Sequence, residues 1–347
     1  MTGRHIHVVG SMPFANAAQG FDVLSDALGP RLKRLPDGET GARRGWSAWQ
    51  DKIFAADPQF VKTGTIHSLA DKPGDPGVAK YTIAPGLAAK DVRFNLPHAR
   101  FAIEDYRAFE TLKKAGKIPP ACRFQFDLAP GHVVIWRWFV EELHEVLEPA
   151  YDRALIGQIG EMLKVIPAHE LAIQWDIASR VFARLEWNQP TRYGATKAAM
   201  IETFTANLVA LGEGVPEQVE LMYHFCYGYT GEKHTVEPSD MGDMVAMANR
   251  VSERIKRPID LIHMPVPQNR SDAGYFAPLA RLRLHPETEI ALGLVHPADG
   301  VSGGRTRMKS AQTFRSDFLI ATECGWGQRP VATIPALLDL HRELSGY

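Results

Sequence analysis

The feature that most constrains the fold of this chain is a repeating order in which an apolar run of strand length precedes a helical segment. Most of these runs are apolar throughout, which is typical of strands that helices cover. Seven or eight such units follow one another, with short links in the second half of the chain. Alternation of this kind produces parallel sheets with right-handed crossovers. The sequence therefore predicts an α/β fold, a closed (β/α)8 TIM barrel, with an open doubly wound sheet as the second interpretation.

The predicted strands lie at intervals along the whole chain. They are His5–Pro13, Leu32–Leu35, Ala121–Pro130, Glu170–Ala178, Val219–Gly228, Ile259–Pro267, Glu289–Pro297 and Phe318–Gly327. A length of 347 residues suits one barrel, so residues 1–347 are predicted to form a single domain. The stretch at about 57–97 is rich in proline and glycine and is expected to be an irregular insertion with a hairpin. Val134–Val165 is expected to form two helices that break around Pro149.

Composition and missing motifs argue against several classes of protein. The net charge of −1 provides no strong field for nucleic acid or anionic membrane. No apolar run approaches the ~18 residues that a membrane span needs, and the one near the N-terminus is too short for a signal peptide. An odd number of cysteines, three, favours a reducing compartment. The usual dinucleotide and P-loop signatures are absent from the sequence. We expect a cytoplasmic protein without nucleic-acid or membrane partners, and its oligomeric state stays open.

The most informative pair of residues is His224 and Cys226, at the end of the run VELMYHFCYG. Residues i and i+2 of a strand point to the same face, so the imidazole and the thiol leave the strand side by side, as a shared zinc ion requires. The pair also fits a half-buried histidine beside a small apolar cysteine. A second run, FLIATECGWG, places Cys324 at another strand end, which favours the metal site. Cys122 has no partner nearby and is expected to be structural.

Further polar and aromatic residues follow predicted strands, where the loops of a barrel carry function. Asp37 and Glu39 follow one such strand in a loop that also fits a plain turn. Asp176 lies near the end of another strand, where a helix cap or a loop ion pair is the alternative. Trp46 fits either a wall of the pocket or the core.

More candidates for substrate contact come from other strand ends and from a predicted helix start. Ser11 follows Gly10 at the end of the first strand, and His296 lies at the end of the strand Glu289–Pro297. Arg305 and Arg307 lie in GVSGGRTR, which is predicted to open a helix and could hold a carboxylate or a phosphate. The alternative for these arginines is a solvated helix start.

These short motifs resemble a known family when they are taken in order. Gly10-Ser11, Gln174-x-Asp176, His224-x-Cys226 and Cys324-Gly325 occur in the order seen in the C-terminal half of cobalamin-independent methionine synthase. The chain resembles the barrel group that includes this enzyme, uroporphyrinogen decarboxylase and the epoxyalkane:coenzyme M transferases. The resemblance covers most of the chain, although the insertion has no counterpart in it.

The resemblance implies a zinc ion held by His224, Cys226 and Cys324 at the carboxyl mouth of the barrel. Zinc in such enzymes binds the sulfur of a thiol and lowers its pKa, so that a thiolate can attack an electrophilic carbon. Two thiolates and an imidazole also favour zinc over magnesium or calcium on chemical grounds. The implied activity is transfer of an alkyl group, most simply methyl, between an alkyl donor and a small-molecule thiol.

The sequence departs from the synthases at two of these positions. Where they carry a glutamate ligand, this chain reads IDLIHMPVP, which makes His263 the candidate for a fourth ligand or an acid–base group. Asp176 matches the acid that holds the amino group of the thiol, but Ile177 and Ala178 stand where the synthases have Glu-Pro. Asp176 and Glu39 are therefore predicted to orient the substrate, with no assignment of homocysteine or folate.

Two other functions stay open at this point. One is a metal-free barrel lyase of the decarboxylase type, in which Asp37, Asp176 or arginines handle a carboxylated substrate and the cysteines are incidental. The other is a protein that binds a thiol or a metal without turnover. Activity that survives replacement of Cys226 and of Cys324 by serine would support the lyase. Tight zinc binding without product from any thiol and methyl donor would support the binding protein.

Overall fold

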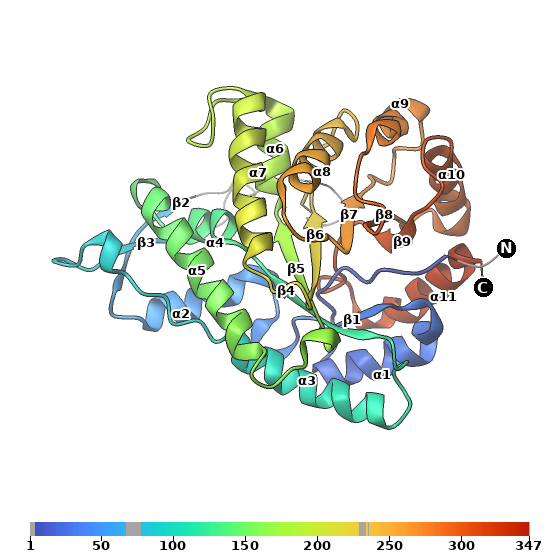
Figure 1. Ribbon diagram of the computed structural model, residues 1–347, viewed down its shortest axis with the longest axis horizontal. Coiled ribbons are helices and arrows are strands. Elements are labelled where there is room, and N and C mark those ends of the chain that lie inside the picture. The colour runs from blue at the N-terminus through green and yellow to red at the C-terminus, as the bar shows by residue number, and fades with distance from the viewer. Residues whose placement is uncertain (1–3, 67–77, 229–233, 235, 347) are drawn as a thin grey trace.

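The centre of the fold is a parallel sheet of seven strands in the order β1-β4-β5-β6-β7-β8-β9 (Figure 1). The computed structural model describes residues 4–66, 78–228, 234 and 236–346. The strands are β1 (Arg34–Pro36), β4 (Arg123–Leu128), β5 (Leu171–Ile177), β6 (Glu220–Phe225), β7 (Leu261–Pro265), β8 (Glu289–Val295) and β9 (Leu319–Thr322). Every pairing between neighbours is parallel, as the alternation of strands and helices predicts.

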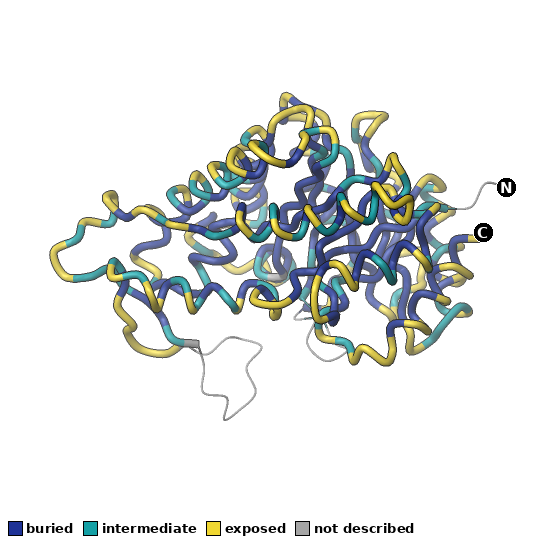
Figure 2. The backbone as a smooth tube through the Cα atoms, turned by 90° about the horizontal axis from the view of Figure 1, so that it is seen from below, coloured by how far each residue is buried: buried dark blue, intermediate teal, exposed yellow. Residues whose placement is uncertain are grey.

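Helices connect the strands and cover the outer face of the sheet. They are α1 (Ala17–Leu28), α2 (Asp51–Ala56), α3 (His98–Lys114), α4 (Gly131–Trp138), α5 (His144–Met162), α6 (Ser179–Trp187), α7 (Lys197–Glu213), α8 (Gly242–Arg254), α9 (Ala273–Phe276), α10 (Gly300–Gln312) and α11 (Ile334–Ser345). Helix α1 shows why such segments are helical: the Asn16 side chain caps its first turn, and Phe21, Leu24 and Leu28 form a buried stripe. Figure 2 shows buried residues gathered toward the centre of the molecule and exposed residues along the outer turns of the chain.

The sheet curls so that both of its edges meet the same extended segment near the N-terminus. Ile6 forms one parallel bridge to Leu32, just before β1, and another to Ile320 of β9. The carbonyls of Val8 and Val9, however, accept hydrogen bonds from the Gln125 side chain at 3.3 and 3.2 Å instead of from a neighbouring strand. The predicted strand His5–Pro13 is therefore an extended segment with single bridges, and the regular sheet has seven strands and not eight.

The period-two alternation of the strands separates two faces of the sheet. In β5, Ile173 and Trp175 belong to the main core between sheet and helices, whereas Ala172 lies in a second, smaller cluster. That cluster contains residues of the N-terminal segment and of β5 to β9, namely Val9, Ala172, Met222, Leu261, Ala291, Leu319 and Ala321. The inner face of the sheet is thus a separate apolar layer, and residues with the same parity, such as Asp176 and His224, lie on that face.

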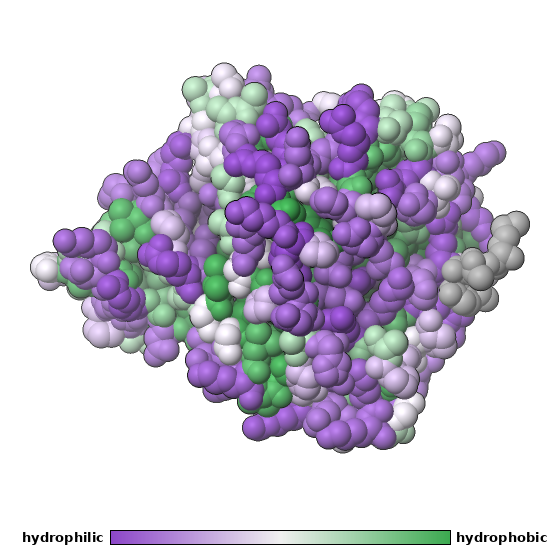
Figure 3. All heavy atoms as spheres, in the orientation of Figure 1, coloured by the Kyte–Doolittle hydropathy of each residue, from purple (hydrophilic) through white to green (hydrophobic). Residues whose placement is uncertain are grey.

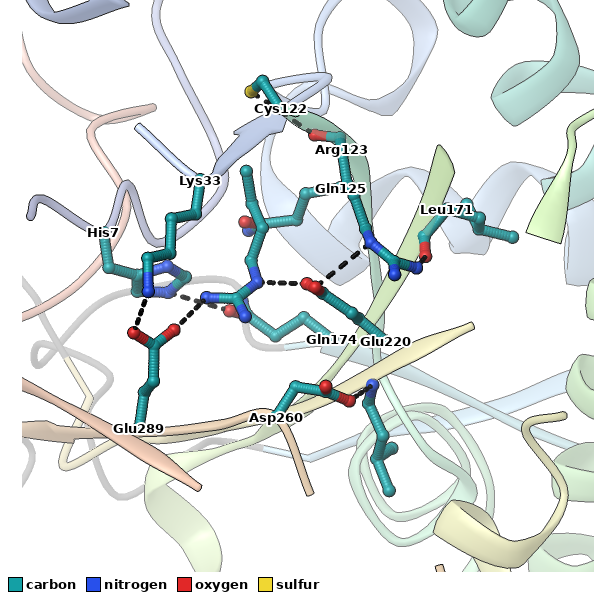
Figure 4. A network of polar contacts seen from close by, with 12 residues as sticks. His7, Lys33, Cys122, Arg123, Gln125, Leu171, Gln174, Glu220, Asp260 and Glu289 are labelled. Carbon is teal, nitrogen blue, oxygen red and sulfur yellow. Dashed lines mark hydrogen bonds and ion pairs between the residues drawn. The ribbon is translucent and has the colours of Figure 1, made fainter. Parts of the chain in front are cut away.

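Charged residues fill the inner face at the amino ends of the strands, below this apolar layer (Figure 4). Arg34 donates to Glu220 and, at 3.0 Å, to Glu289. Lys33 also binds Glu289, at 2.5 Å, and Arg123 binds Glu220 at 3.1 Å. Four of these five residues are the first residue of a strand, and Lys33 directly precedes β1, so the network ties β1, β4, β6 and β8 together at one end.

The predicted insertion contains an antiparallel hairpin of β2 (Phe60–Ile66) and β3 (Val78–Ile83), beside α2 (Figure 1). Residues 67–77 of the insertion lie outside the described part of the chain. An aromatic cluster fixes the hairpin to the body of the protein, because Phe60 and Tyr81 pack against Phe54 and Phe139.

No helix in the described residues combines the length and the apolar character that crossing a membrane requires. Figure 3 shows mostly hydrophilic residues on one face of the molecule, with hydrophobic residues in scattered groups.

Candidate metal centre

Three metal-binding side chains meet at the carboxyl end of the sheet. His224 lies near the end of β6, Cys226 directly follows that strand, and Cys324 follows β9 by two residues. One ligand atom of each residue lies within 4.8 Å of the other two. Ligands of a tetrahedral zinc ion are separated by roughly 3.3–3.8 Å, so small side-chain shifts suffice to enclose the ion. The residues present therefore fit zinc in both donor chemistry and arrangement.

The ring of His263 fixes which nitrogen of His224 is available to a metal. His263 Nε2 lies 3.0 Å from the carbonyl oxygen of Thr322, which can only accept, so this nitrogen carries the proton. Burial lowers the pKa of His263 to about 4, and burial together with His263 lowers the pKa of His224 well below its usual value, so both rings are neutral. The two Nδ1 atoms lie 2.7 Å apart, and His224 must donate across this contact. Its Nε2 then keeps a free lone pair, the form a metal ligand needs.

His263 was predicted as a fourth ligand or an acid–base group, and the structure places it elsewhere in the site. Both of its ring nitrogens are engaged, and the residue is fully buried behind His224. This arrangement is that of a residue that orients a ligand.

The two cysteines are held by backbone and side-chain contacts. The N–H of Gly228 donates to Cys226 Sγ at 3.2 Å. The Thr322 hydroxyl donates to the Cys324 carbonyl at 2.7 Å and accepts from the Trp326 indole at 2.8 Å. A hydrogen bond with Cys226 and burial raise the pKa of Cys324 well above its usual value. Without a metal this thiol is protonated at neutral pH, so metal binding releases protons.

Three buried acids, Glu39, Asp127 and Asp176, form a carboxylate cluster beside the cysteines. Burial and the charges of Asp176, Asp127 and Cys324 raise the pKa of Glu39 well above its usual value. Burial and the charge of Asp176 do the same for the pKa of Asp127, and burial raises the pKa of Asp176 to about 7. Neighbouring acids whose pKa values move upward together are typical of functional sites.

Two glutamines hold two of these acids in the same way. Gln125 donates to Asp127 and Gln174 donates to Asp176, each over 3.0 Å and each from two residues earlier on its strand. The Trp46 indole donates to the other oxygen of Asp176 at 3.2 Å. Asp127 is absent from the residues predicted to form the site. The alternation of its strand places it on the same face as Gln125, which is the signal that could have found it.

The loop after β1 positions Glu39 and Trp46. Asp37 is fully buried, binds the Arg43 guanidinium and accepts the backbone N–H of Glu39 at 3.1 Å. Glu39 and Trp46 both have positive φ, 48° and 57°, which is a strained conformation for residues with side chains. Asp37, predicted to contact substrate, is instead an anchor for this loop, because its carboxylate is used within the protein.

Ser11 and His296 lie at the rim of the site. The Ser11 carbonyl accepts the N–H of Trp326 at 2.6 Å, which brings the first segment beside the loop of Cys324. His296 lies 2.8 Å from the Val266 carbonyl, and 3.8 Å from a carboxylate oxygen of Glu323. His296 and Glu323 line a cavity of about 850 Å³ beyond the ends of β7, β8 and β9.

Arg305 lies on the protein surface and does not reach the site. Its side chain is 66% exposed and lies 3.6 Å from Glu343 of α11. Helix α10 already begins at Gly300, so Arg305 falls inside the helix on its outer face and not at its start. Arg307 points inward, where Asp299 binds it. The structure therefore places Arg305, which was predicted to bind substrate, on the surface beside α11 and not among the residues of the metal centre.

No protein-family model and no curated protein matches this sequence. Two solved structures share its fold. One, from Listeria monocytogenes and provisionally assigned as a vitamin-B12-independent methionine synthase, is 13% identical, with a TM-score of 0.54 over 94% of this chain and 84% of the other. The second, a methyltransferase from Methanosarcina mazei, is 10% identical, with a TM-score of 0.51 over 99% of this chain and 94% of the other. The resemblance predicted from the sequence is confirmed at the level of the fold.

Proposed function

We propose that this protein is a zinc-dependent enzyme that transfers an alkyl group, most simply methyl, between a donor and a thiol. The observation that carries the proposal is the convergence of His224, Cys226 and Cys324 at the carboxyl ends of parallel strands. In barrels of this kind that end is where catalysis takes place. The names of the two structural neighbours, a methionine synthase and a methyltransferase, support the same kind of reaction.

His224, Cys226 and Cys324 would hold the metal. Zinc bound there supplies Lewis acidity that lowers the pKa of a thiol substrate, and three protein ligands leave a coordination position for that sulfur. The reaction then forms a bond from sulfur to the alkyl carbon and breaks the bond from that carbon to the donor. The donor leaves with the electron pair, and the proton of the thiol goes to solvent.

The other site residues bind and orient the reactants. Asp176 and Glu39 orient the polar end of the thiol, Trp46 holds Asp176, and His263 holds the ring of His224. His296 lies at the cavity beyond β7 to β9, from which the alkyl donor would approach. Substrate positioning of this kind supplies a large part of the barrier reduction in bimolecular reactions.

The metal-free decarboxylase has less support. Such an enzyme binds a carboxylated substrate and needs cationic side chains to do so, whereas the groups gathered here are three carboxylates.

We also propose that the N-terminal segment, which bridges both sheet edges at Ile6, acts as the eighth strand of a closed barrel. A cytoplasmic location is part of the same proposal: all three cysteines are free, and a reducing compartment keeps thiols in that state.

Metal analysis of the purified protein tests the proposal. We expect about one zinc ion per chain in the wild type and loss of this zinc in Cys226→Ser and Cys324→Ser, because each variant removes a thiolate ligand. Cys122→Ser is the matched control: this cysteine is buried outside the cluster and its variant keeps the metal. Stoichiometric zinc in both site variants would contradict the assignment, and so would a wild type without metal. Zinc without product from any thiol and methyl donor would identify a binding protein instead.

A further inference from the structure

A fully buried oxygen of the carboxylate cluster has no hydrogen-bond partner within the described part of the chain. Asp127 is 3% exposed, and its Oδ1 accepts from Gln125. Among the residues that the structure describes, its Oδ2 has no hydrogen-bond partner. A buried carboxylate oxygen without a partner carries a large desolvation cost. Such an atom beside a metal centre indicates a ligand that supplies the missing donor.

Because Gly10 has no side chain, it leaves the space that Asp127 Oδ2 occupies. A Cβ at Gly10 would collide with Asp127 Oδ2, so the absence of a side chain there lets the carboxylate reach the first segment of the chain. Ser11 follows directly and lies against Gly325, next to Cys324. The unpartnered oxygen therefore lies between the cluster and the chain segment that borders the metal centre.

The cluster has no neutralising cation of its own among the described residues. The hydrogen bonds given to Asp127 and Asp176 come from neutral donors, two glutamine amides and one indole. Arg43, whose charge acts on Asp127, is held by Asp37 and Asp105. Three acids with no paired lysine or arginine favour a ligand with a cationic group, which holds them ionised despite their burial, over a ligand that brings a further carboxylate.

We infer that the thiol taken by this site carries an ammonium group and no carboxylate, as in an aminothiol of the cysteamine type, and that Asp127 determines this specificity. An ammonium group has three N–H donors, and Glu39, Asp127 and Asp176 offer three carboxylates to accept them. An amino-acid thiol would bring its own carboxylate into the same negative surroundings. The inference rests on the proposed function, because the sulfur of the thiol is placed at the metal centre.

Thiol binding to the cobalt-loaded protein tests this inference. Cobalt(II) takes the place of zinc in thiolate sites, and its visible absorption changes when another sulfur binds. The probes are cysteamine, 2-mercaptoethanol, 3-mercaptopropionate and homocysteine, which differ in charge, titrated at one pH near neutrality. We expect cysteamine to bind at least about tenfold more tightly than 2-mercaptoethanol, and 3-mercaptopropionate to bind most weakly.

The variant Asp127→Asn assigns the specificity to this residue. It keeps the shape of the side chain and removes its charge, so we expect affinity for cysteamine to fall about tenfold or more while affinity for 2-mercaptoethanol stays the same. Comparing variant with wild type for each thiol cancels the different acidities of the probes. The control is Asp243→Asn. It removes a carboxylate on α8 that binds Lys197 on α7, and it should leave both affinities unchanged.

The outcomes separate this inference from the proposed function. Tighter binding of homocysteine than of cysteamine, or an equal loss for all thiols in Asp127→Asn, would overturn the inference and leave the zinc enzyme standing. Absence of cobalt binding, or a cobalt spectrum that no thiol changes, would overturn both. The wild-type series alone decides the charge of the ligand if the variant fails to fold.

Discussion

At the scale of single residues, the contact between His224 and His263 determines the tautomer in which His224 would meet the proposed metal. The carbonyl of Thr322 fixes the proton of His263, and His263 fixes the proton of His224. A ligand oriented by a partner of this kind loses less entropy when the metal binds. The partner thus contributes to metal affinity without touching the metal.

Replacing His263 by alanine tests this role. We expect zinc affinity to fall by about 10- to 100-fold, because the ring of His224 loses its partner and its fixed tautomer. A competition titration with a chromophoric chelator measures the affinity, and the urea midpoint of the metal-free protein shows whether the fold is kept. His285→Ala is the control, since His285 also bonds a backbone carbonyl, that of Ser252, away from the site. Unchanged zinc affinity in the His263 variant would refute the role.

Residue spacing indicated which residues come together as the proposed metal ligands, but it did not indicate how the predicted substrate contacts are buried and paired. His224 and Cys226 belong to one strand end, so the period of two residues places them on the same face. The curl of the sheet then brings Cys324, which follows β9, beside them. The buried pairing of Asp37 with Arg43 depends on a loop conformation that no periodicity encodes. Asp127 was missed for a related reason, because its importance comes from Glu39 and Asp176 on other elements.

At the scale of elements, a buried ion pair anchors the loop between β1 and α2, and this loop positions Glu39 and Trp46 at the site. The carboxylate of Asp37 binds Arg43 and the backbone of Glu39, and the same loop keeps Glu39 and Trp46 at positive φ. Strained residues persist only where their surroundings hold them, and here the ion pair does so.

The variant Asp37→Asn is expected to lower the free energy of unfolding by about 2–4 kcal/mol, because Arg43 keeps only the more distant Asp105 as a charged partner. We expect zinc content to stay at the wild-type value and thiol binding to weaken, since Glu39 moves and the metal ligands do not. Urea unfolding, metal analysis and the cobalt titration measure these three quantities. Asp57→Asn, in the loop before β2, is the control with little effect. Loss of zinc together with stability would show that the loop supports the ligands as well.

Element boundaries show where local sequence signals fail. The segment Val134–Val165 does form two helices, but they separate at residues 139–143, and Pro149 lies inside α5. A proline within the first two turns of a helix removes few backbone hydrogen bonds, so tertiary packing keeps the helix intact. The first segment was predicted as a strand and became irregular, because the side chains of Gln125 and Gln174 bind its carbonyls.

At the scale of the whole molecule, the inner face of the sheet has three layers with different tasks. Ion pairs around Arg34 fill the amino end, an apolar layer fills the middle, and the proposed metal ligands and the acids occupy the carboxyl end. This division is general in barrels, where one end of the strands stabilises the fold and the other carries the chemistry. The alternation along the chain predicted the layers of sheet and helix, but which charges pair across the inner face depends on the register of strands distant in sequence.

The ion-pair layer should therefore affect stability and leave the metal centre intact. Arg34 is buried between Glu220 and Glu289, so Arg34→Met leaves these acids without their shared partner. We expect a loss of about 2–3 kcal/mol in the free energy of unfolding at pH 7, with the zinc content unchanged. Arg305→Met, which removes an exposed ion pair, should change stability by less than about 0.5 kcal/mol.

The effect of Arg34→Met should also depend on pH in a definite direction. Burial alone would raise the pKa of Glu289, but the charges of Arg34 and Lys33 outweigh it and hold this pKa below its ordinary value of 4.5. A carboxylate with a lowered pKa in the folded state contributes stability above pH 4.5 and loses it as the pH falls through the folded-state value. The difference in stability between wild type and Arg34→Met should therefore be largest near pH 7 and shrink below pH 4.5. Urea midpoints of both proteins across this range measure it, and an equal difference at every pH would show that Arg34 acts through packing and not through its charge.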